Sequence, residues 1–82
     1  MKHARKDYNR IQDPEHKIPE DEPVFLLRAQ DAAAPDAVQN WCLSALMAGA
    51  RTNIIDAARK QRDAMIEWQR AYGMKIPDMP EK

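Results

Sequence analysis

Cysteine, histidine and glycine are scarce in this 82-residue chain, and each scarcity excludes a kind of structure or chemistry. The one cysteine, Cys42, cannot form an intrachain disulfide. Together with His3 and His16 it offers too few ligands, too widely separated, for a structural zinc site. The two glycines, at positions 49 and 73, form no glycine-rich phosphate loop. We therefore expect no disulfide framework, no metal and no cofactor.

A surplus of either charge is also absent, because 13 basic residues balance 13 acidic ones. The chain thus lacks the overall positive charge that favours nucleic acid. No apolar run has the length of a membrane span, and no hydrophobic segment follows the charged N-terminus as in a signal peptide. With few aromatic residues the core is small, and a cytoplasmic location is expected.

The proline and charge pattern divides the chain into an arm (residues 1–22), a core (23–73) and a tail (74–82). The arm is charged, and Pro14 and Pro19 interrupt any helix there. Few apolar side chains are present to offset the entropy of ordering it. Both the arm and the tail are predicted to be extended.

The stretch from Pro23 to Asp31 contains the apolar run 24–27 and is either a strand or a helix. Val24 and Phe25 favour a strand, which we prefer, whereas Asp21 as a cap and Pro23 in a first turn would suit a helix. A strand needs a partner, and no second candidate is visible in the sequence. The interpretation is therefore an antiparallel ribbon with a second copy, with Phe25 and Leu27 on one face of the interface.

A first helix is predicted from Pro35, a residue suited to a first helical turn, to the stop at Gly49. Its apolar stripe is Val38, Trp41, Cys42, Ala45 and Leu46. Leu43 and Met47 lie outside this stripe, so the apolar arc is wide. We expect Leu43 and Met47 to be buried at an interface between subunits.

A second helix is predicted from Thr52 or Asn53, either of which can cap it, to Tyr72 before Gly73. Its predicted inward stripe is Ile54, Ala57, Ala58, Gln61, Ala64, Met65, Trp68, Ala71 and Tyr72. The alanines at 57, 64 and 71 are spaced by seven residues, which would allow another helix to approach closely.

The order strand, helix, turn, helix over residues 23–72 resembles the ribbon-helix-helix family of DNA-binding proteins. Residues 48–59 resemble the turn into that family's second helix. The resemblance implies that Thr52 and Asn53 contact a phosphate. It also implies that Leu26, Arg28 and Gln30 enter the major groove.

A second resemblance covers most of the chain. Residues 7–14 and 18–31, followed by Ala34-Pro35 and Trp41, resemble small proteins encoded by bacteriophages and prophages. Proteins of that group are often accessory: they inhibit host enzymes, bind host defence signals or regulate expression. The resemblance implies action in the cytoplasm of a bacterial host.

No nucleophile, base and pocket pattern supports catalysis, so a non-enzymatic binding protein is predicted. The fold class is mainly α: a short strand or extended segment, then a two-helix hairpin, in a ribbon-helix-helix-like homodimer or higher oligomer. The preferred function is capture of a host protein or a small nucleotide signal. The candidate ligand contacts are Arg28, Gln30, Asp31, Arg51, Thr52 and Asn53. The alternative is a DNA-binding regulator.

Overall fold

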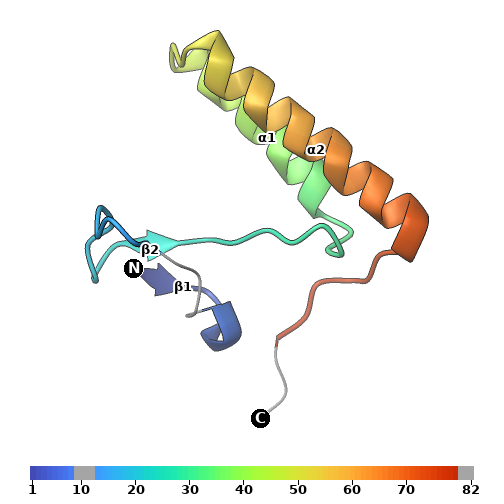
Figure 1. Cartoon of the computed structure of the whole chain (residues 1–82), viewed down its shortest axis with the longest axis horizontal. Coiled ribbons are helices and arrows are strands. Elements are labelled where there is room, and N and C mark those ends of the chain that lie inside the picture. The colour runs from blue at the N-terminus through green and yellow to red at the C-terminus, as the bar shows by residue number, and fades with distance from the viewer. Residues whose placement is uncertain (9–12, 80–82) are drawn as a thin grey trace. The chain divides into compact units, whose positions relative to one another are not determined.

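The computed structural model describes residues 1–8 and 13–79, and these form two compact units. The first unit comprises residues 1–26 with 78–82, and the second comprises residues 27–77. The described elements are two strands, a short 3₁₀ turn and two helices, drawn in Figure 1. The predicted mainly helical class is thus confirmed in its coarse outline. Residues 9–12 of the predicted arm and 80–82 of the predicted tail lie outside the described part.

The first unit is built on a pair of very short strands. Strand β1 (Lys2–His3) pairs in parallel with β2 (Pro23–Val24), so that Lys2 lies opposite Pro23 and His3 opposite Val24. Proline can begin a strand because its missing N–H removes only one possible ladder hydrogen bond. The turn η1 (Lys6–Tyr8) follows β1.

The strand prediction for residues 23–31 is correct for the first two residues; of the rest, only Asp31 pairs, in an isolated parallel bridge with Lys75. Residues 25–28 have no regular secondary structure. The expectation that the chain contains no second strand was also wrong, because Lys2–His3 supplies it. A charged dipeptide at the N-terminus has no strand-like pattern, so its pairing depends on a contact with residues far along the chain.

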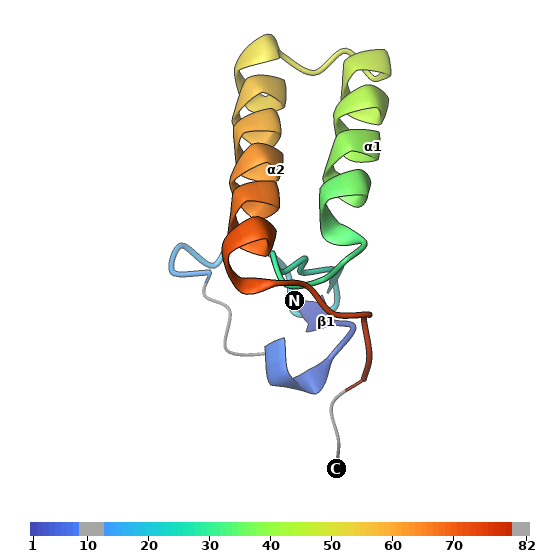
Figure 2. The same ribbon diagram turned by 90° about the vertical axis from the view of Figure 1, so that its right-hand side faces the viewer.

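The second unit is an antiparallel helical hairpin of α1 (Ala34–Met47) and α2 (Thr52–Tyr72), side by side in Figure 2. Pro35 lies in the first turn of α1, as predicted. The closing turn is a Schellman motif: the amide of Ala50 donates to Ala45 O, the amide of Gly49 donates to Leu46 O, and Gly49 has a φ of 88°. Both ends of α1 are therefore set by local residues: Pro35 in the first turn and Gly49 after the last one.

The start of α2 differs from the prediction in its capping. Arg51, in an extended conformation, is the N-cap and makes no side-chain capping bond. Thr52 and Asn53 lie inside the first turn, where the Asn53 side-chain oxygen accepts from the amide of Ile54 at 2.9 Å. With Arg51 as the N-cap, the helix begins at Thr52, one residue earlier than a Thr52 cap would place it. The C-terminal end at Gly73 is as predicted.

Candidate functional site

The hairpin core is small. The buried apolar side chains of the described residues are Ala34, Pro35, Cys42, Ile55 and Met65. The Cys42 sulfur lies 4.0 Å from the carbonyl oxygen of Ile55, which is in the first turn of α2. A half-buried polar contact adds to this core, because the Arg62 guanidinium donates to the Gln39 side-chain oxygen and also pairs with Asp63 at 2.8 Å. So small a core leaves most of the apolar surface of the hairpin uncovered.

The open end of the hairpin is held by a group of hydrogen bonds that we call the clasp. The amide of Lys75 donates to Gln30 O at 2.8 Å, and the amide of Ala32 donates to Lys75 O at 2.9 Å. From α2, the Gln69 amide group donates to Ala29 O at 2.8 Å and to Asp31 O at 3.1 Å. The clasp therefore connects the segment before α1 to the segment after α2.

Asp31 contributes to the clasp and to the start of α1. Its carboxylate accepts from the amide of Ala33 at 2.8 Å, which is an Asx turn leading into the helix. Its carbonyl oxygen also accepts from the amide of Ala34 at 3.0 Å. Two of the predicted ligand contacts therefore have structural roles: Gln30 through its main chain, and Asp31 through its main chain and its carboxylate.

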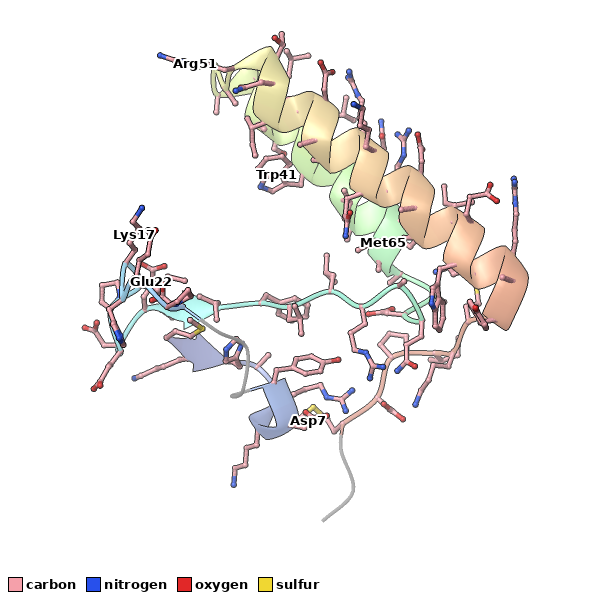
Figure 3. All side chains as sticks on the ribbon, viewed as in Figure 1. Asp7, Lys17, Glu22, Trp41, Arg51 and Met65 are labelled. Atoms are coloured by element: carbon pink, nitrogen blue, oxygen red, sulfur yellow. The ribbon has the colours of Figure 1, made fainter. Side chains whose placement is uncertain are left out.

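The structure places the predicted ligand contacts in two groups. Arg28, Gln30 and Asp31 lie at the open end of the hairpin, whereas Arg51, Thr52 and Asn53 lie at its closed end, where Figure 3 labels Arg51. Helix α1, with 14 residues, separates the ends by roughly 20 Å. A single hairpin does not bring these two groups to one small ligand.

The predicted interface residues are mostly exposed within one chain. Phe25 is exposed, Leu27 is half-buried, and on α1 the side chains of Leu43 and Met47 are 49% and 90% exposed. Trp41 and Leu46 belong to the stripe predicted to face inward, but both are close to half exposed. The wide apolar arc of α1 is therefore present, and the described residues leave much of it exposed.

The predicted inward stripe of α2 is only partly correct. Met65 is buried and Ala58 half-buried as expected, and Ile55, which the prediction omitted, is buried. The rest of the predicted stripe, exposed in the structure, is Ile54, Ala57, Gln61, Ala64, Trp68, Ala71 and Tyr72. Apolar residues lie on more than one face of α2, and α1 packs against only one of these faces. The spacing of the apolar residues in the sequence does not indicate which face of α2 is buried.

We call the exposed positions Ile54, Ala57, Gln61, Ala64, Trp68 and Ala71 the outer stripe of α2. Their spacing alternates between three and four residues, so they lie along one line on the helix surface. The Trp68 ring contacts that of Tyr72 on the next turn, with ring centres 4.9 Å apart. The outer stripe is thus a regular line of exposed side chains along α2.

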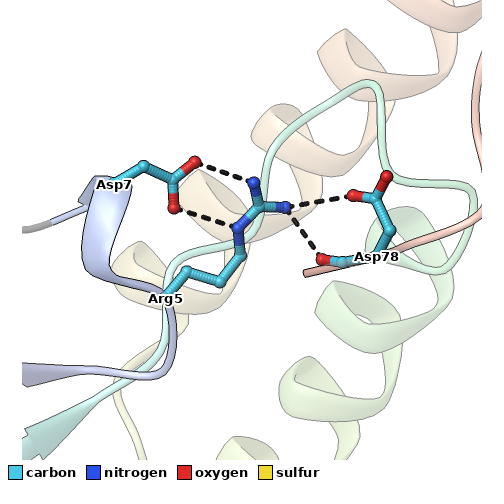
Figure 4. A network of polar contacts seen from close by, with 3 residues as sticks. All are labelled: Arg5, Asp7 and Asp78. Atoms are coloured by element: carbon cyan, nitrogen blue, oxygen red, sulfur yellow. Dashed lines mark hydrogen bonds and ion pairs between the residues drawn. The ribbon is translucent and has the colours of Figure 1, made fainter. Parts of the chain in front are cut away.

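Arg5 is paired within the first unit. The Arg5 guanidinium pairs with the Asp7 carboxylate at 2.7 and 3.0 Å and donates to the Asp78 carbonyl oxygen at 3.0 Å (Figure 4). It also lies over the ring of Tyr8, 4.9 Å from the ring centre. The hydrogen bonds to Asp7 raise the pKa of Arg5 above its ordinary value. Arg5 is thus a structural cation.

A shallow hollow of about 420 Å³ beside the two strands was not anticipated from the sequence. It is lined by Lys2, His3, Ala4, Pro23, Val24 and Phe25. Both ring nitrogens of His3 are buried and make no hydrogen bond within the described part of the chain. The pairing of β1 with β2 creates this hollow, and no local sequence signal indicates that pairing.

Comparison with known proteins found no matching family model, characterised protein or solved structure. Among the described residues, no group of three or more His, Cys, Asp or Glu side chains is placed to hold a metal ion. Neither α1 nor α2 combines the length and apolar character that crossing a membrane requires. The uncovered apolar side chains of the hairpin are the strongest functional feature of the described residues.

Proposed function

We propose that this chain is a non-enzymatic binding protein, of the phage accessory type, that captures a host protein through the apolar side chains of its helical hairpin. The supporting observation is the contrast between a core of very few buried side chains and many large exposed ones on both helices. Soluble proteins rarely leave such apolar surface uncovered unless it contacts a partner. Aromatic and Met side chains, which this surface contains, are enriched in protein interfaces.

A host protein is a better match to this surface than a small nucleotide signal. A nucleotide needs several charged and polar groups converging within a few ångströms. Within one hairpin, Arg28 and Arg51 lie near opposite ends. Nucleotide capture therefore depends on an assembly that joins the two ends, whereas protein capture needs only the exposed faces.

The test compares two double variants on α1. In Leu43→Glu/Met47→Glu, two exposed apolar side chains separated by one helical turn become charged. In the matched control, Asn40→Glu/Ser44→Glu, the same charges at the same spacing replace exposed polar residues of the same helix. Circular dichroism should show equal helicity for both variants, because all four side chains are solvent-exposed.

The measurement is retention of a protein from a bacterial lysate by the immobilised full chain, with mass spectrometry of what is bound. We expect wild type and the control to retain the same protein and Leu43→Glu/Met47→Glu to lose it. Equal retention by both variants, or no specific protein retained by wild type, contradicts protein capture through this surface.

Parallel assays address the other two ligand classes. A rise in melting temperature with a cyclic oligonucleotide would support capture of a nucleotide signal instead. Binding to duplex DNA at low salt, lost in Arg28→Ala, would support a ribbon-helix-helix regulator.

A further inference from the structure

The outer stripe of α2 is complementary to itself in one particular arrangement. Its first, third and fifth residues are the larger ones, Ile54, Gln61 and Trp68, and the residues between and after them are alanines. When two such helices run antiparallel and are centred between residues 62 and 63, each large side chain faces an alanine of the other copy. Ile54 then faces Ala71, Trp68 faces Ala57, and Gln61 faces Ala64.

We propose that the occupant of the outer stripe is a second copy of this chain, paired antiparallel through α2 about a two-fold axis. This goes beyond the proposed function, because it assigns a second copy of the chain, and not a host protein, to the outer stripe. In an isologous contact each pair of facing residues occurs twice. Alternation of large and small residues across facing positions is what allows two helices to pack at 8–10 Å.

Charges beside the stripe support the same arrangement. Lys60 and Glu67 each lie immediately before a large stripe residue, so they occupy equivalent flanking positions. In the antiparallel arrangement Lys60 of one copy lies beside Glu67 of the other, offset by two residues or about 3 Å along the axis. Opposite charges at such flanking positions select partner and orientation between paired helices. The contact contains this pair twice.

The large side chains are accessible for this contact. Ile54 is 49% and Trp68 40% exposed, and the alanines at 57, 64 and 71 are all exposed. Glu67 already bonds to Arg70 at 2.8 Å, but both side chains are exposed, so Glu67 can turn to Lys60 of the second copy at small cost. No part of the hairpin core has to open.

The arrangement has a consequence for the predicted ligand contacts. At this register Thr52 of one copy lies level with Gly73 of the other. The closed end of one hairpin therefore lies next to the open end of its neighbour, where Gln30 and Asp31 form part of the clasp. The two groups of residues that a single chain separates come to the same end of the dimer.

The first experiment measures the dissociation constant of the full chain, mass 9.4 kDa, by sedimentation equilibrium. Lys60→Glu places two acidic pairs at the contact and should weaken the dimer roughly tenfold or more. The double variant Lys60→Glu/Glu67→Lys should restore it to within about threefold of wild type. The control is Arg59→Glu, the same charge reversal on the side of α2 opposite the outer stripe. It should leave association unchanged.

The second experiment tests orientation by disulfide trapping. An equimolar mixture of Ile54→Cys and Ala71→Cys proteins should give the mixed disulfide dimer, whereas either protein alone should give little. Cys42 is buried and should not compete. Dimers from either protein alone at the same rate would indicate another orientation and overturn the proposal.

A monomeric wild type, equal weakening by Lys60→Glu and Arg59→Glu, or no rescue in the double reversal also overturns the dimer. Ala64→Glu gives a further check, since a long charged side chain at the centre should abolish association while helicity persists. Failure of the dimer is distinguishable from failure of protein capture: a monomer that still retains a host protein through Leu43 and Met47 overturns only the dimer. A dimer that retains none overturns only host-protein capture.

Discussion

Removal of the Gln69 side chain should destabilise the hairpin from its open end. The Gln69 amide group makes two hydrogen bonds in the half-buried clasp, to Ala29 O at 2.8 Å and to Asp31 O at 3.1 Å. A typical hydrogen bond contributes about 1 kcal/mol net to stability, so Gln69→Ala should cost about 2 kcal/mol. Helix propensity offsets little of this, because alanine and glutamine are both good helix formers.

The expected change is large enough to measure by thermal denaturation. For a domain of 60–100 residues, a loss of 1 kcal/mol lowers Tm by about 4–8 °C, so Gln69→Ala should lower it by about 8–16 °C. Circular dichroism follows the transition. Gln61→Ala is the control, since Gln61 is an exposed glutamine on the same helix. Recording both variants at two protein concentrations separates intrinsic stability from association.

Amide exchange gives a local readout of the same contact. In Gln69→Ala the amides of Ala32 and Lys75, which bond across the clasp, should lose more protection than amides in the middle of α2. Equal Tm values for Gln69→Ala and Gln61→Ala, together with unchanged exchange at Ala32 and Lys75, would refute the argument that Gln69 holds the clasp.

Three further changes test the hairpin by urea unfolding or thiol chemistry. Met65→Ala should cost about 2–5 kcal/mol because Met65 is buried, while Met47→Ala should change stability by less than about 0.5 kcal/mol because Met47 is almost fully exposed; equal effects would contradict the core assignment. Cys42, which is fully buried, should react with a thiol reagent only as fast as the hairpin opens, and rapid modification of the native protein would contradict its burial. Gly73→Ala should cost about 1–3 kcal/mol, since φ 86° and ψ 179° fall in a region that side chains disfavour, and an unchanged urea midpoint would show that the backbone there adapts freely.

The approximate ends of the two helices were predictable because the sequence signals for a helix end are local. Pro35 suits the first turn of α1, Gly49 supplies the positive φ of the Schellman turn, and Gly73 ends α2. Each of these effects arises within a few residues of the helix end, so no knowledge of distant contacts was needed. Helix α2 begins at Thr52, within the predicted start, but the predicted side-chain cap was wrong, because Arg51 is the N-cap and makes no side-chain bond.

The apolar surface of α2 shows where periodicity stops being informative. The alternation of apolar residues was visible, but Ile55 and Ile54 are adjacent, and both faces satisfy a helical period. Which face is buried depends on where α1 lies. The face predicted to be inward is largely the outer stripe, and the same residues became the candidate contact for a second copy.

The sequence by itself determined the helical class, the hairpin order and the scarcity of groups for disulfides or metals, because these follow from composition and from interactions between near neighbours. Tertiary structure alone decided the pairing of Lys2–His3 with Pro23–Val24, the clasp of Gln69 and Lys75, and the buried side of α2. Each of these joins residues far apart in the chain. Their energies depend on loop closure and on the relative placement of whole elements, which no local pattern encodes.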